Sequence, residues 1–409
     1  MEGCPIRALS LFTGAGGLDI GLEFAGFDTI GAVEADPQAR QTLQLNKPNW
    51  VLSQTPQLRE DNFERVLGEI PGAQNCEALI GGPPCQPFSK AAQWSTGKWK
   101  GRSDERFSSV VAMLEIAKAI KPQVIMIENV PGFASLKSGA IRSIRAKLGH
   151  INRTEGTNYR LNVWELNALN YGVPQIRNRI ICVAFRDGLL LAPPIHTHSA
   201  QPDTCTYPVL NCWDAIGDLD NGTEAEEVSQ SAKWLDLLPS IPEGSNYLFH
   251  TSRGDGEPIF GWRTRYWSFL LKLAKALPSW TLSASPGPTT GPFHWSNRRL
   301  SIREQARLQT FPDNWRFAGN YRVATSQIGN AVPCALASAV GAHILESLQI
   351  SPKEDWQRSL IPSKRVCPEP HPTEPAPMKY RGCSIPADHP GPGKGPGAKN
   401  RVLNSTEVS

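Results

Sequence analysis

Short apolar runs alternate with amphipathic stretches between Ile6 and about Arg186. Four runs have the length of buried strands, at residues 8–12, 29–34, 78–81 and 124–128. Residues 107–120 have the three- and four-residue spacing of an amphipathic helix. Because a regular succession of strands and helices is typical of parallel sheets, the pattern predicts an α/β fold with a doubly wound sheet.

The pattern changes after about Leu190. Residues 190–292 are rich in Pro, Gly, Trp and Thr and show no sustained periodicity. We therefore expect residues 1–189 to form a first domain and residues 190–292 to form a second domain that is smaller and irregular. No internal repeat is visible in either part.

Regular spacing returns in residues 293–350, with helical patterns at 301–310 and 331–349. This segment is expected to rejoin the first domain. Residues 351–409 are dominated by Pro, Gly, Lys and Ser. Such a composition buries too little apolar surface to offset the entropy of ordering the chain, so it predicts a disordered tail.

Composition and cysteine spacing exclude several classes of protein. The chain has 409 residues, 40% of them hydrophobic, and a net charge of +4, which neither requires nor excludes a nucleic-acid partner. Its nine cysteines include no C-x-x-C pair, which argues against a zinc ribbon or a disulfide framework. No metal site is expected. The apolar runs are too short for a membrane span, and the chain start lacks a secretory signal, so an intracellular location is expected.

A glycine-rich turn follows the first predicted strand. Phe12-Thr-Gly14-Ala-Gly16-Gly17 lies between a strand and a helix, where backbone amides can approach a nucleotide-like ligand. Glu34 ends the next strand, at the place where a carboxylate binds ribose hydroxyls in such folds. Because the G-x-G-x-x-G spacing is absent, an adenosine-type ligand is favoured over NAD.

A rigid loop then presents a single cysteine. Gly81-Gly-Pro-Pro84-Cys85-Gln86-Pro-Phe-Ser89 follows a buried run, at the carboxyl end of a strand where open α/β sheets place their active sites. A lone cysteine is usually a buried core residue. A core cysteine does not need two prolines before it and Gln-Pro-Phe-Ser after it, so the loop indicates a nucleophile.

A glutamate follows another buried strand. Glu128-Asn129-Val130-Pro131 comes directly after four apolar residues, so Glu128 is expected at the mouth of the sheet beside the Cys85 loop. A surface carboxylate or a helix cap is the alternative. A partly desolvated glutamate at that place could hold a proton or share it with a ligand nitrogen.

These elements, in this order, resemble the DNA cytosine-5 methyltransferase family. Further blocks carry the resemblance: Gln175-x-Arg177-x-Arg179, Arg299-Leu-Ser-Ile-Arg303-Glu-Gln-Ala-Arg307-Leu-Gln-Thr-Phe-Pro312 and Gln327-Ile-Gly-Asn330-Ala331-Val-Pro333. The likeness covers about Ile6 to Glu346, apart from the irregular middle region. It implies a Rossmann-like sheet that binds S-adenosylmethionine, and a chain similar to the bacterial or phage members of restriction-modification systems.

The resemblance implies a role for each residue near the reacting base. Cys85 adds to C6 of a cytosine that has been flipped out of the duplex. Glu128 bonds N3 and the exocyclic amine, Arg179 contacts O2, and Arg177 orients the site.

The same resemblance implies a set of cofactor-binding residues. They lie in the glycine turn, at the expected ribose and adenine contacts, before Cys85, and in the block that ends at Pro333. These residues are Phe12, Gly14, Gly17, Glu34, Asp61, Pro84, Asn330 and Ala331.

Double-stranded DNA is the implied partner. Residues 190–292 occupy the place of the domain that recognises the target sequence in this family. DNA contacts are expected from Gln86, Ser89, Thr281 and Arg299. The arginine-rich block from Arg298 to Arg307 is either a solvated helix face or a support for recognition. The resemblance implies a cytoplasmic monomer that is associated with the nucleoid. It also implies that the protein acts beside a restriction endonuclease of the same specificity.

Three other functions remain open at this point. A tRNA cytosine-5 methyltransferase shares the fold, although the Cys-Phe-Thr signature of that branch is missing here. A DNA-binding protein without catalysis is disfavoured by intact Cys85, Glu128 and the arginine pair. A nicotinamide-dependent oxidoreductase is disfavoured by the glycine spacing and by the Pro-Pro-Cys loop.

Overall fold

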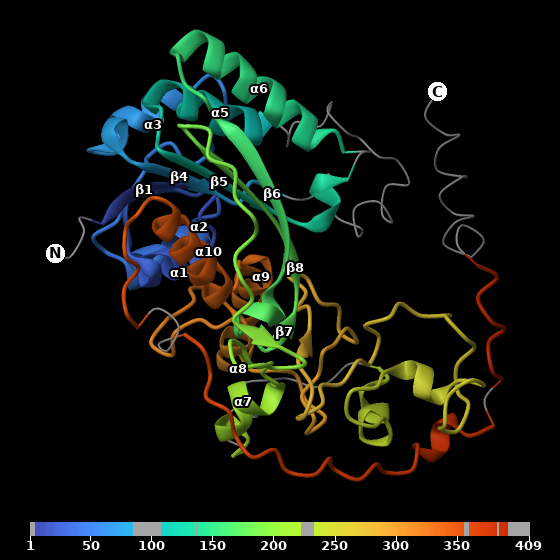
Figure 1. Ribbon diagram of the computed structural model, residues 1–409. Coiled ribbons are helices and arrows are strands. Elements are labelled where there is room, and N and C mark those ends of the chain that lie inside the picture. Colours follow the sequence, from blue (N-terminus) through green and yellow to red (C-terminus); the bar gives the residue numbers. More distant parts are fainter. Residues whose placement is uncertain are drawn as a thin grey trace, which may run out of the picture. The chain divides into compact units, whose positions relative to one another are not determined.

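The structure is a computed structural model that describes residues 5–84, 108–135, 138–221, 233–355, 360–382 and 384–391 (Figure 1). Three residues singled out above, Cys85, Gln86 and Ser89, lie outside the described residues.

The chain forms two compact units. The first, here called the sheet unit, comprises Met1–Leu210, Thr281–Ser285 and Ile302–Lys364. The second, the irregular unit, comprises Asn211–Trp280, Pro286–Ser301 and Arg365–Ser409.

The predicted middle domain therefore differs from the irregular unit at both of its boundaries. Residues just after 190 stay on the sheet unit because Asn162 and Trp164 bond the backbone of Leu191 at 2.7 Å and 3.2 Å.

The sheet unit is built on a seven-stranded sheet of order β3-β2-β1-β4-β5-β8-β6. Its strands are β1 (Ile6–Leu11), β2 (Phe27–Val33), β3 (Val51–Leu52), β4 (Ala78–Gly81), β5 (Val124–Asn129), β6 (Arg160–Asn167) and β8 (Asn178–Phe185). β1 to β5 pair in parallel, whereas β8 is antiparallel to both β5 and β6. The predicted α/β fold is confirmed, with a sheet that is mainly rather than wholly parallel.

Helices cover both faces of this sheet, with α3, α5 and α6 on one face and α1 and α10 on the other (Figure 1). The helices of the unit are α1 (Gly17–Ala25), α2 (Pro37–Asn46), α3 (Phe63–Glu69), α5 (Ser108–Ile120), α6 (Ala140–Glu155), α8 (Ile302–Leu308), α9 (Tyr321–Asn330) and α10 (Cys334–Ser347). Its shorter elements are η1 (Ala73–Asn75), η4 (Pro131–Ala134), η5 (Ala168–Tyr171), β7 (Gln175–Ile176), β9 (His198–Ser199) and β10 (Tyr207–Pro208).

Close packing of α1 on α10 joins the two ends of the sheet unit. A Cβ atom at Gly21 would overlap the carbonyl oxygen of Cys334, and one at Gly341 would lie 2.9 Å from the Cβ of Ala25. Glycine at these positions lets the two helix backbones approach, as small residues do wherever helices pack closely. The contact places residues 331–333, between α9 and α10, beside the glycine turn that follows β1.

One stretch, Tyr321–Ser347, is apolar and long enough to cross a membrane by length and composition alone. It contains α9 and α10, and 83% of its most apolar window is buried inside the structure. Packing against α1 accounts for this composition, because a helix buried on all sides is apolar all round.

The irregular unit has a separate apolar core with little regular structure. Its elements are α7 (Cys212–Ile216), η6 (Gly217–Leu219), η8 (Leu235–Ser240), η9 (Tyr247–His250), β11 (Ser279–Trp280) and η10 (Met378–Tyr380). Aromatic rings pack edge to face at its centre, with Tyr247 5.8 Å and Phe269 5.7 Å from Phe260. The tryptophans and phenylalanines of this segment thus include core residues.

The described part of the chain end makes specific contacts, whereas its composition predicts a disordered tail for residues 351–409. Residues 365–382 and 384–391, here called the C-terminal strap, pack on the irregular unit. The Arg365 guanidinium pairs with Asp218 at 2.7 Å, and the Tyr380 hydroxyl donates to Asp236 at 2.8 Å. Composition does not reveal such contacts, because single side chains of a Pro-rich segment make them with residues that are distant in sequence.

Candidate active site

The glycine turn adopts a backbone that few side chains tolerate. Phe12, Gly14 and Gly16 have φ angles of 56°, 58° and 84°, in the left-handed region. Such a conformation is unusual for phenylalanine and is maintained only where surrounding contacts impose it. Gly17 then opens α1 with no room for a Cβ, since that atom would overlap the carbonyl oxygen of Val332.

The Glu34 carboxylate holds this turn in place. One oxygen accepts a hydrogen bond from the Gly14 amide at 2.6 Å, and the other accepts from the Asp36 amide at 2.7 Å. Burial raises the pKa of Glu34 above its ordinary value, and these backbone donors offset part of the effect. Glu34 is therefore a fixed part of the turn as well as a candidate ligand.

A cavity of about 570 Å³ opens beside the turn, within the size range of small-molecule sites. All of its lining residues belong to the sheet unit. Most of the residues predicted from the sequence line it, namely Phe12, Gly14, Gly17, Glu34, Pro84, Glu128, Arg179, Asn330 and Ala331.

Asp61 does not join this group. Its side chain is 72% exposed and pairs with Arg59 at 3.0 Å, and it is not among the residues that line the cavity. Asn62 accepts a bond from the Arg59 amide at 2.8 Å, so the segment forms a local turn before α3. The structure instead places Asp36, the N-cap residue of α2 and two positions after Glu34, in the lining of the cavity.

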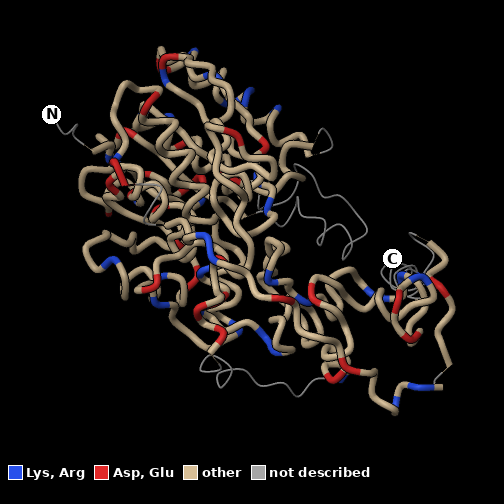
Figure 2. Tube along the Cα trace, turned by 60° about the horizontal axis from the view of Figure 1, so that its bottom comes forward, with Lys and Arg blue, Asp and Glu red and all other residues tan. Residues whose placement is uncertain are grey.

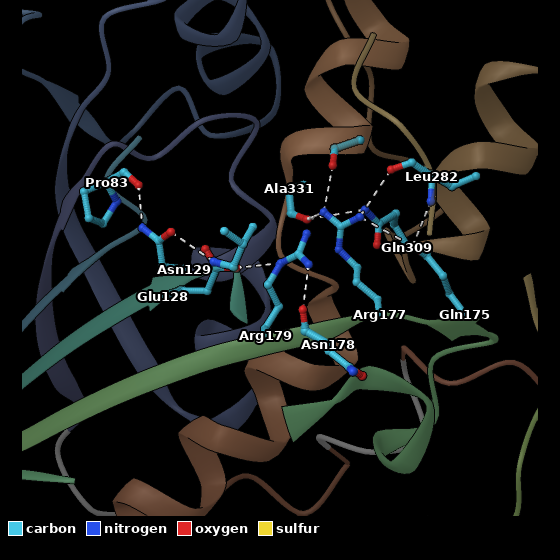
Figure 3. Close-up of polar contacts among 12 residues, drawn as sticks. Pro83, Glu128, Asn129, Gln175, Arg177, Asn178, Arg179, Leu282, Gln309 and Ala331 are labelled. Atoms are coloured by element: carbon cyan, nitrogen blue, oxygen red, sulfur yellow. Dashed lines mark hydrogen bonds and ion pairs between the residues drawn. The ribbon is translucent and has the colours of Figure 1, made fainter. Parts of the chain in front are cut away.

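Glu128 and Arg179 meet across neighbouring strands (Figure 3). The Arg179 Nε atom lies 2.8 Å from the Glu128 carboxylate, and each side chain is only 11% exposed. The pairing follows from the sheet order, since Glu128 is the penultimate residue of β5 and Arg179 is the second residue of the antiparallel neighbour β8. The predicted pair is thus brought together at the cavity.

Burial raises the pKa of the Glu128 carboxyl above its ordinary value. Arg179 and, more weakly, Arg177 oppose this effect by favouring the carboxylate. The two influences leave a carboxyl that can exchange a proton with a ligand more readily than an exposed glutamate can.

Asn129 connects the end of β5 to the loop that precedes Cys85. Its side-chain amide donates to the Pro83 carbonyl at 3.0 Å (Figure 3). A Cβ placed on Gly82 would lie 3.4 Å from the Glu128 carboxylate. The last described residues before Cys85 therefore lie directly beside Glu128.

Arg177 is buried, with 1% exposure, and is not among the residues that line the cavity. It donates to the carbonyl oxygens of Gly329 at 2.7 Å and Ala331 at 2.9 Å (Figure 3). A third contact, at 3.4 Å, reaches the Leu282 carbonyl. Arg177 thus joins three segments that are distant in sequence, among them the one that carries Asn330 and Ala331.

The two candidate DNA contacts that the structure describes, Thr281 and Arg299, belong to different units. The Thr281 hydroxyl donates to the Ile176 carbonyl at 2.7 Å in the sheet unit. In the irregular unit, the Arg299 guanidinium donates to the Pro288 carbonyl at 2.6 Å and lies over the Phe293 ring.

The arginine-rich block is not a solvated helix face. Arg298 is 4% exposed, Arg307 pairs with Asp313 at 2.6 Å, and Arg303 contacts the Pro312 carbonyl at 3.5 Å. These guanidinium groups mostly fix local loops around α8, which removes the first of the two predicted interpretations.

Besides Asp36, the sequence interpretation missed two other charged residues of the cavity. Asp19 is fully buried in α1 and lines the cavity, and Arg322 of α9 lines it as well. The signal for Asp19 was a single carboxylate within the apolar segment Gly17-Leu-Asp-Ile-Gly-Leu22. Arg322 had no comparable signal, because an arginine on an amphipathic helix is ordinarily a surface residue.

Comparison with known proteins identifies relatives along nearly the whole chain. A profile of the family described as C-5 cytosine-specific DNA methylase matches residues 6–346. The chain is 35% identical over 381 residues to the Type II methyltransferase M.SacI of Streptomyces achromogenes, covering 84% of this chain and 93% of that protein. It is 34% identical over 369 residues to the Type II methyltransferase M.PspPI of Psychrobacter sp., covering 86% and 83%.

Solved structures share the fold. A chain described as a DNA modification methyltransferase encoded within an E. coli prophage aligns with a TM-score of 0.57 and 23% identity, covering 84% of this chain and 99% of that one. The S. pombe Dnmt2 methyltransferase aligns with a TM-score of 0.51 and 18% identity, with the same coverage. At these identities the comparison concerns the fold alone.

Proposed function

Because the chain belongs to the C-5 cytosine-specific DNA methylase family, we propose how its residues transfer a methyl group to cytosine and which methyl donor they use. The enzyme is a DNA cytosine-5 methyltransferase. We propose that its cavity binds S-adenosylmethionine and that Cys85 forms a covalent bond to the target cytosine. The observation that carries this proposal is the Glu128–Arg179 pair at 2.8 Å, which lies in the same cavity as the glycine turn and beside the loop that leads to Cys85.

The residues around the cavity fit a donor of this kind. Gly14 and Gly17 keep the turn free of side chains, and Glu34 and Asp36 present carboxylates where ribose hydroxyls would bind. Phe12, Pro84, Asn330 and Ala331 complete the surface. Bound there, S-adenosylmethionine supplies an electrophilic methyl group.

Cys85 is proposed to act as the nucleophile. Its thiolate forms a bond to C6 of the cytosine, and the ring electrons shift toward C5, which becomes nucleophilic. After C5 has gained the methyl group it loses its proton to a base, the C6–sulfur bond breaks, and the thiolate leaves. The cytosine ring must lie outside the double helix for the Cys85 thiolate to reach C6. The target cytosine is therefore proposed to flip out of the duplex.

Glu128 and Arg179 are proposed to hold the cytosine and draw electrons from it. Protonated Glu128 would donate to N3 and accept from the exocyclic amine, and Arg179 would donate to O2. The bonds donated to N3 and O2 strengthen as negative charge develops on the ring, which stabilises the transition state. The raised pKa of Glu128 favours the proton that this role needs.

Duplex DNA of one short sequence is the proposed substrate, read by the irregular unit, with Thr281, Arg299, Gln86 and Ser89 as proposed DNA contacts. Acidic and basic residues are interspersed along both units (Figure 2). Sequence recognition would therefore depend on individual groove contacts more than on overall attraction to phosphate. Because the relatives are Type II methyltransferases, we propose a cytoplasmic, nucleoid-associated monomer paired with a restriction endonuclease.

Base-resolution sequencing after expression in a methylation-deficient bacterium tests this function. We expect 5-methylcytosine confined to one short motif in cells that express the wild type, and none with Cys85→Ala. The purified Cys85→Ala protein should still bind S-adenosylmethionine and DNA. Methylation by that variant would contradict the nucleophile assignment, and methylation of tRNA in place of DNA would favour the tRNA enzymes that share the fold.

A further inference from the structure

Asp19 is a carboxylate that the chemistry above leaves unused. It is the third residue of α1, it is 0% exposed, and it lines the cavity. No hydrogen bond of standard geometry reaches either of its oxygens from the described residues, and the nearby Ser10 hydroxyl and the backbone of α1 stabilise its charge only in part. A buried carboxylate without a cationic partner tends to stay protonated, and a cation placed beside it would favour its charged form.

The groups around Asp19 do not neutralise it. The charged residues that influence it are Glu23 of the same helix and Glu34 after β2, and both are acidic. Glu23 already pairs with Lys47. From α10, the Cys334 thiol faces Asp19 and stays neutral, because burial raises the pKa of that thiol. From β1, the Ser10 hydroxyl lies near Asp19 and also contacts Thr13 at 2.9 Å.

The cavity as a whole is acidic. Its lining contains four acidic side chains, Asp19, Glu34, Asp36 and Glu128, and two basic ones, Arg179 and Arg322, for a formal charge of −2. Glu128 and Arg179 pair with each other. Asp19, Glu34, Asp36 and Arg322 are the other charged residues of the lining. Their net negative formal charge favours a cationic ligand.

We propose that Asp19 makes this cavity selective for the cationic sulfonium donor over its neutral thioether product. The proposal rests on S-adenosylmethionine being the donor. The donor and S-adenosylhomocysteine share the adenosine, the amine and the carboxylate, and they differ by one methyl group and one positive charge. A buried carboxylate beside the cavity distinguishes the two through that charge, because the interior screens it less than water does.

Ionisation of Asp19 is coupled to this selectivity. Burial raises the pKa of Asp19 from 3.8 to about 7, and the Ser10 hydroxyl and the helix backbone offset part of the rise. A cation in the cavity favours the charged carboxylate and lowers that pKa. Donor binding at about pH 6.5 should therefore release protons from Asp19, and donor affinity should rise as the pH passes through about 7.

Calorimetric titration of the full chain tests the proposal without any activity measurement. S-adenosylmethionine and S-adenosylhomocysteine are titrated at about pH 6.5 in two buffers of different ionisation enthalpy, which counts the protons released. The donor should release more protons than the product. In Asp19→Asn the difference should vanish, and the preference for donor over product should fall by about tenfold, the factor that corresponds to one unit of pKa change. Asp28→Asn removes an exposed carboxylate outside the lining and should behave as wild type.

Equal proton release for the two ligands by the wild-type protein would overturn the proposal, whether or not the Asp19→Asn protein folds. An unchanged preference in a folded Asp19→Asn protein would overturn it as well. If the wild-type protein bound neither ligand, the donor assignment itself would fail and this inference with it.

Discussion

The Glu128 carboxyl is subject to opposing influences at the scale of a single residue. Burial favours its neutral form, whereas the Arg179 guanidinium at 2.8 Å favours the carboxylate. Such a balance suits a group that must exchange a proton with a ring nitrogen and still keep its orientation. It also makes the site sensitive to changes that preserve shape but remove the titratable proton.

Glu128→Gln should therefore retain binding and lose turnover. Glutamine keeps the size of the side chain but cannot protonate N3, and Arg179 loses its charged partner. Acid–base groups of this kind contribute about 100-fold or more to rate, so single-turnover methyl transfer should fall by at least that factor. Glu165→Gln, an exposed position on the outer strand β6, is the matched control. A Glu128→Gln rate within a few-fold of wild type would remove Glu128 from the chemistry.

Asp19 predicts a pH dependence of stability in the absence of ligand. The folded protein keeps the Asp19 proton up to about pH 7, whereas the unfolded chain loses it near the ordinary pKa of 3.8. Between these values the folded state binds more protons, so the free energy of unfolding that this group contributes falls as pH rises. Asp19→Asn has no such loss. Its stability relative to wild type should increase by roughly 1 kcal/mol per pH unit between about pH 5 and 7.

Urea unfolding of both proteins at three pH values in that window measures the difference. A stability difference that stays constant across the window would show that Asp19 does not titrate there. The same experiment with saturating S-adenosylmethionine should reduce the slope, because the bound cation favours the charged carboxylate.

The α1–α10 contact governs stability at the scale of elements. Gly21 of α1 lies against the Cys334 carbonyl with no room for a further carbon atom. In Gly21→Ala the helices must separate, because the obstructing atom belongs to backbone, and overpacking of this kind costs about 1–3 kcal/mol. The separation would also move the start of α1, where Gly17 lines the cavity.

Gly68→Ala is the control for helix propensity. Gly68 lies in α3 and a Cβ there would have no neighbour within 4 Å. Alanine is favoured over glycine in helices by up to about 1 kcal/mol, so this variant should be neutral or slightly more stable. Thermal unfolding compares the two variants. Equal effects of both substitutions would contradict a packing role for Gly21.

The elements around the cavity could be predicted because each has a local signature. β1 with its glycine turn, β4 with its Gly-Pro-Pro loop and β5 with Glu128 are apolar runs that end in residues of special conformation or charge. Parallel pairing then brings the strand ends together without any further information. The pairing of Glu128 with Arg179 follows once β8 lies beside β5.

Residues whose role depends on distant partners could not be predicted in the same way. Arg177 was expected to orient the site, but its bonds to the carbonyls of Gly329 and Ala331, more than 150 positions away, had no signal in the sequence. Asp61 was assigned from a loose match and forms a local ion pair. No periodicity encodes which backbone oxygen a buried guanidinium will reach.

At the scale of the whole molecule, the C-terminal strap extends the protein beyond the part that matches the family, residues 6–346. Its contacts lie within the irregular unit. Tyr380 stacks on Trp234 with ring centroids 5.0 Å apart, and the His389 amide donates to the Trp262 carbonyl at 2.9 Å. The backbone oxygens of Pro386 and Ala387 occupy the space where Gly261 would carry a Cβ. A segment with so many specific contacts stabilises the unit on which it packs.

Ending the chain after Lys364 should therefore destabilise the irregular unit while the sheet unit stays folded. Removal of Tyr380 exposes aromatic rings in the core of the irregular unit, Asp218 loses its ion pair with Arg365, and Asp236 loses its bond from Tyr380. Limited proteolysis should then cut first within residues 211–280, and duplex DNA binding should weaken at least tenfold. Binding of S-adenosylmethionine should change little, because every residue that lines its proposed cavity belongs to the sheet unit. Ending the chain after Gly391 keeps all of these contacts and should leave protection and DNA binding as in wild type. If the shorter chain resisted proteolysis equally well, the strap would be dispensable for the unit that it contacts.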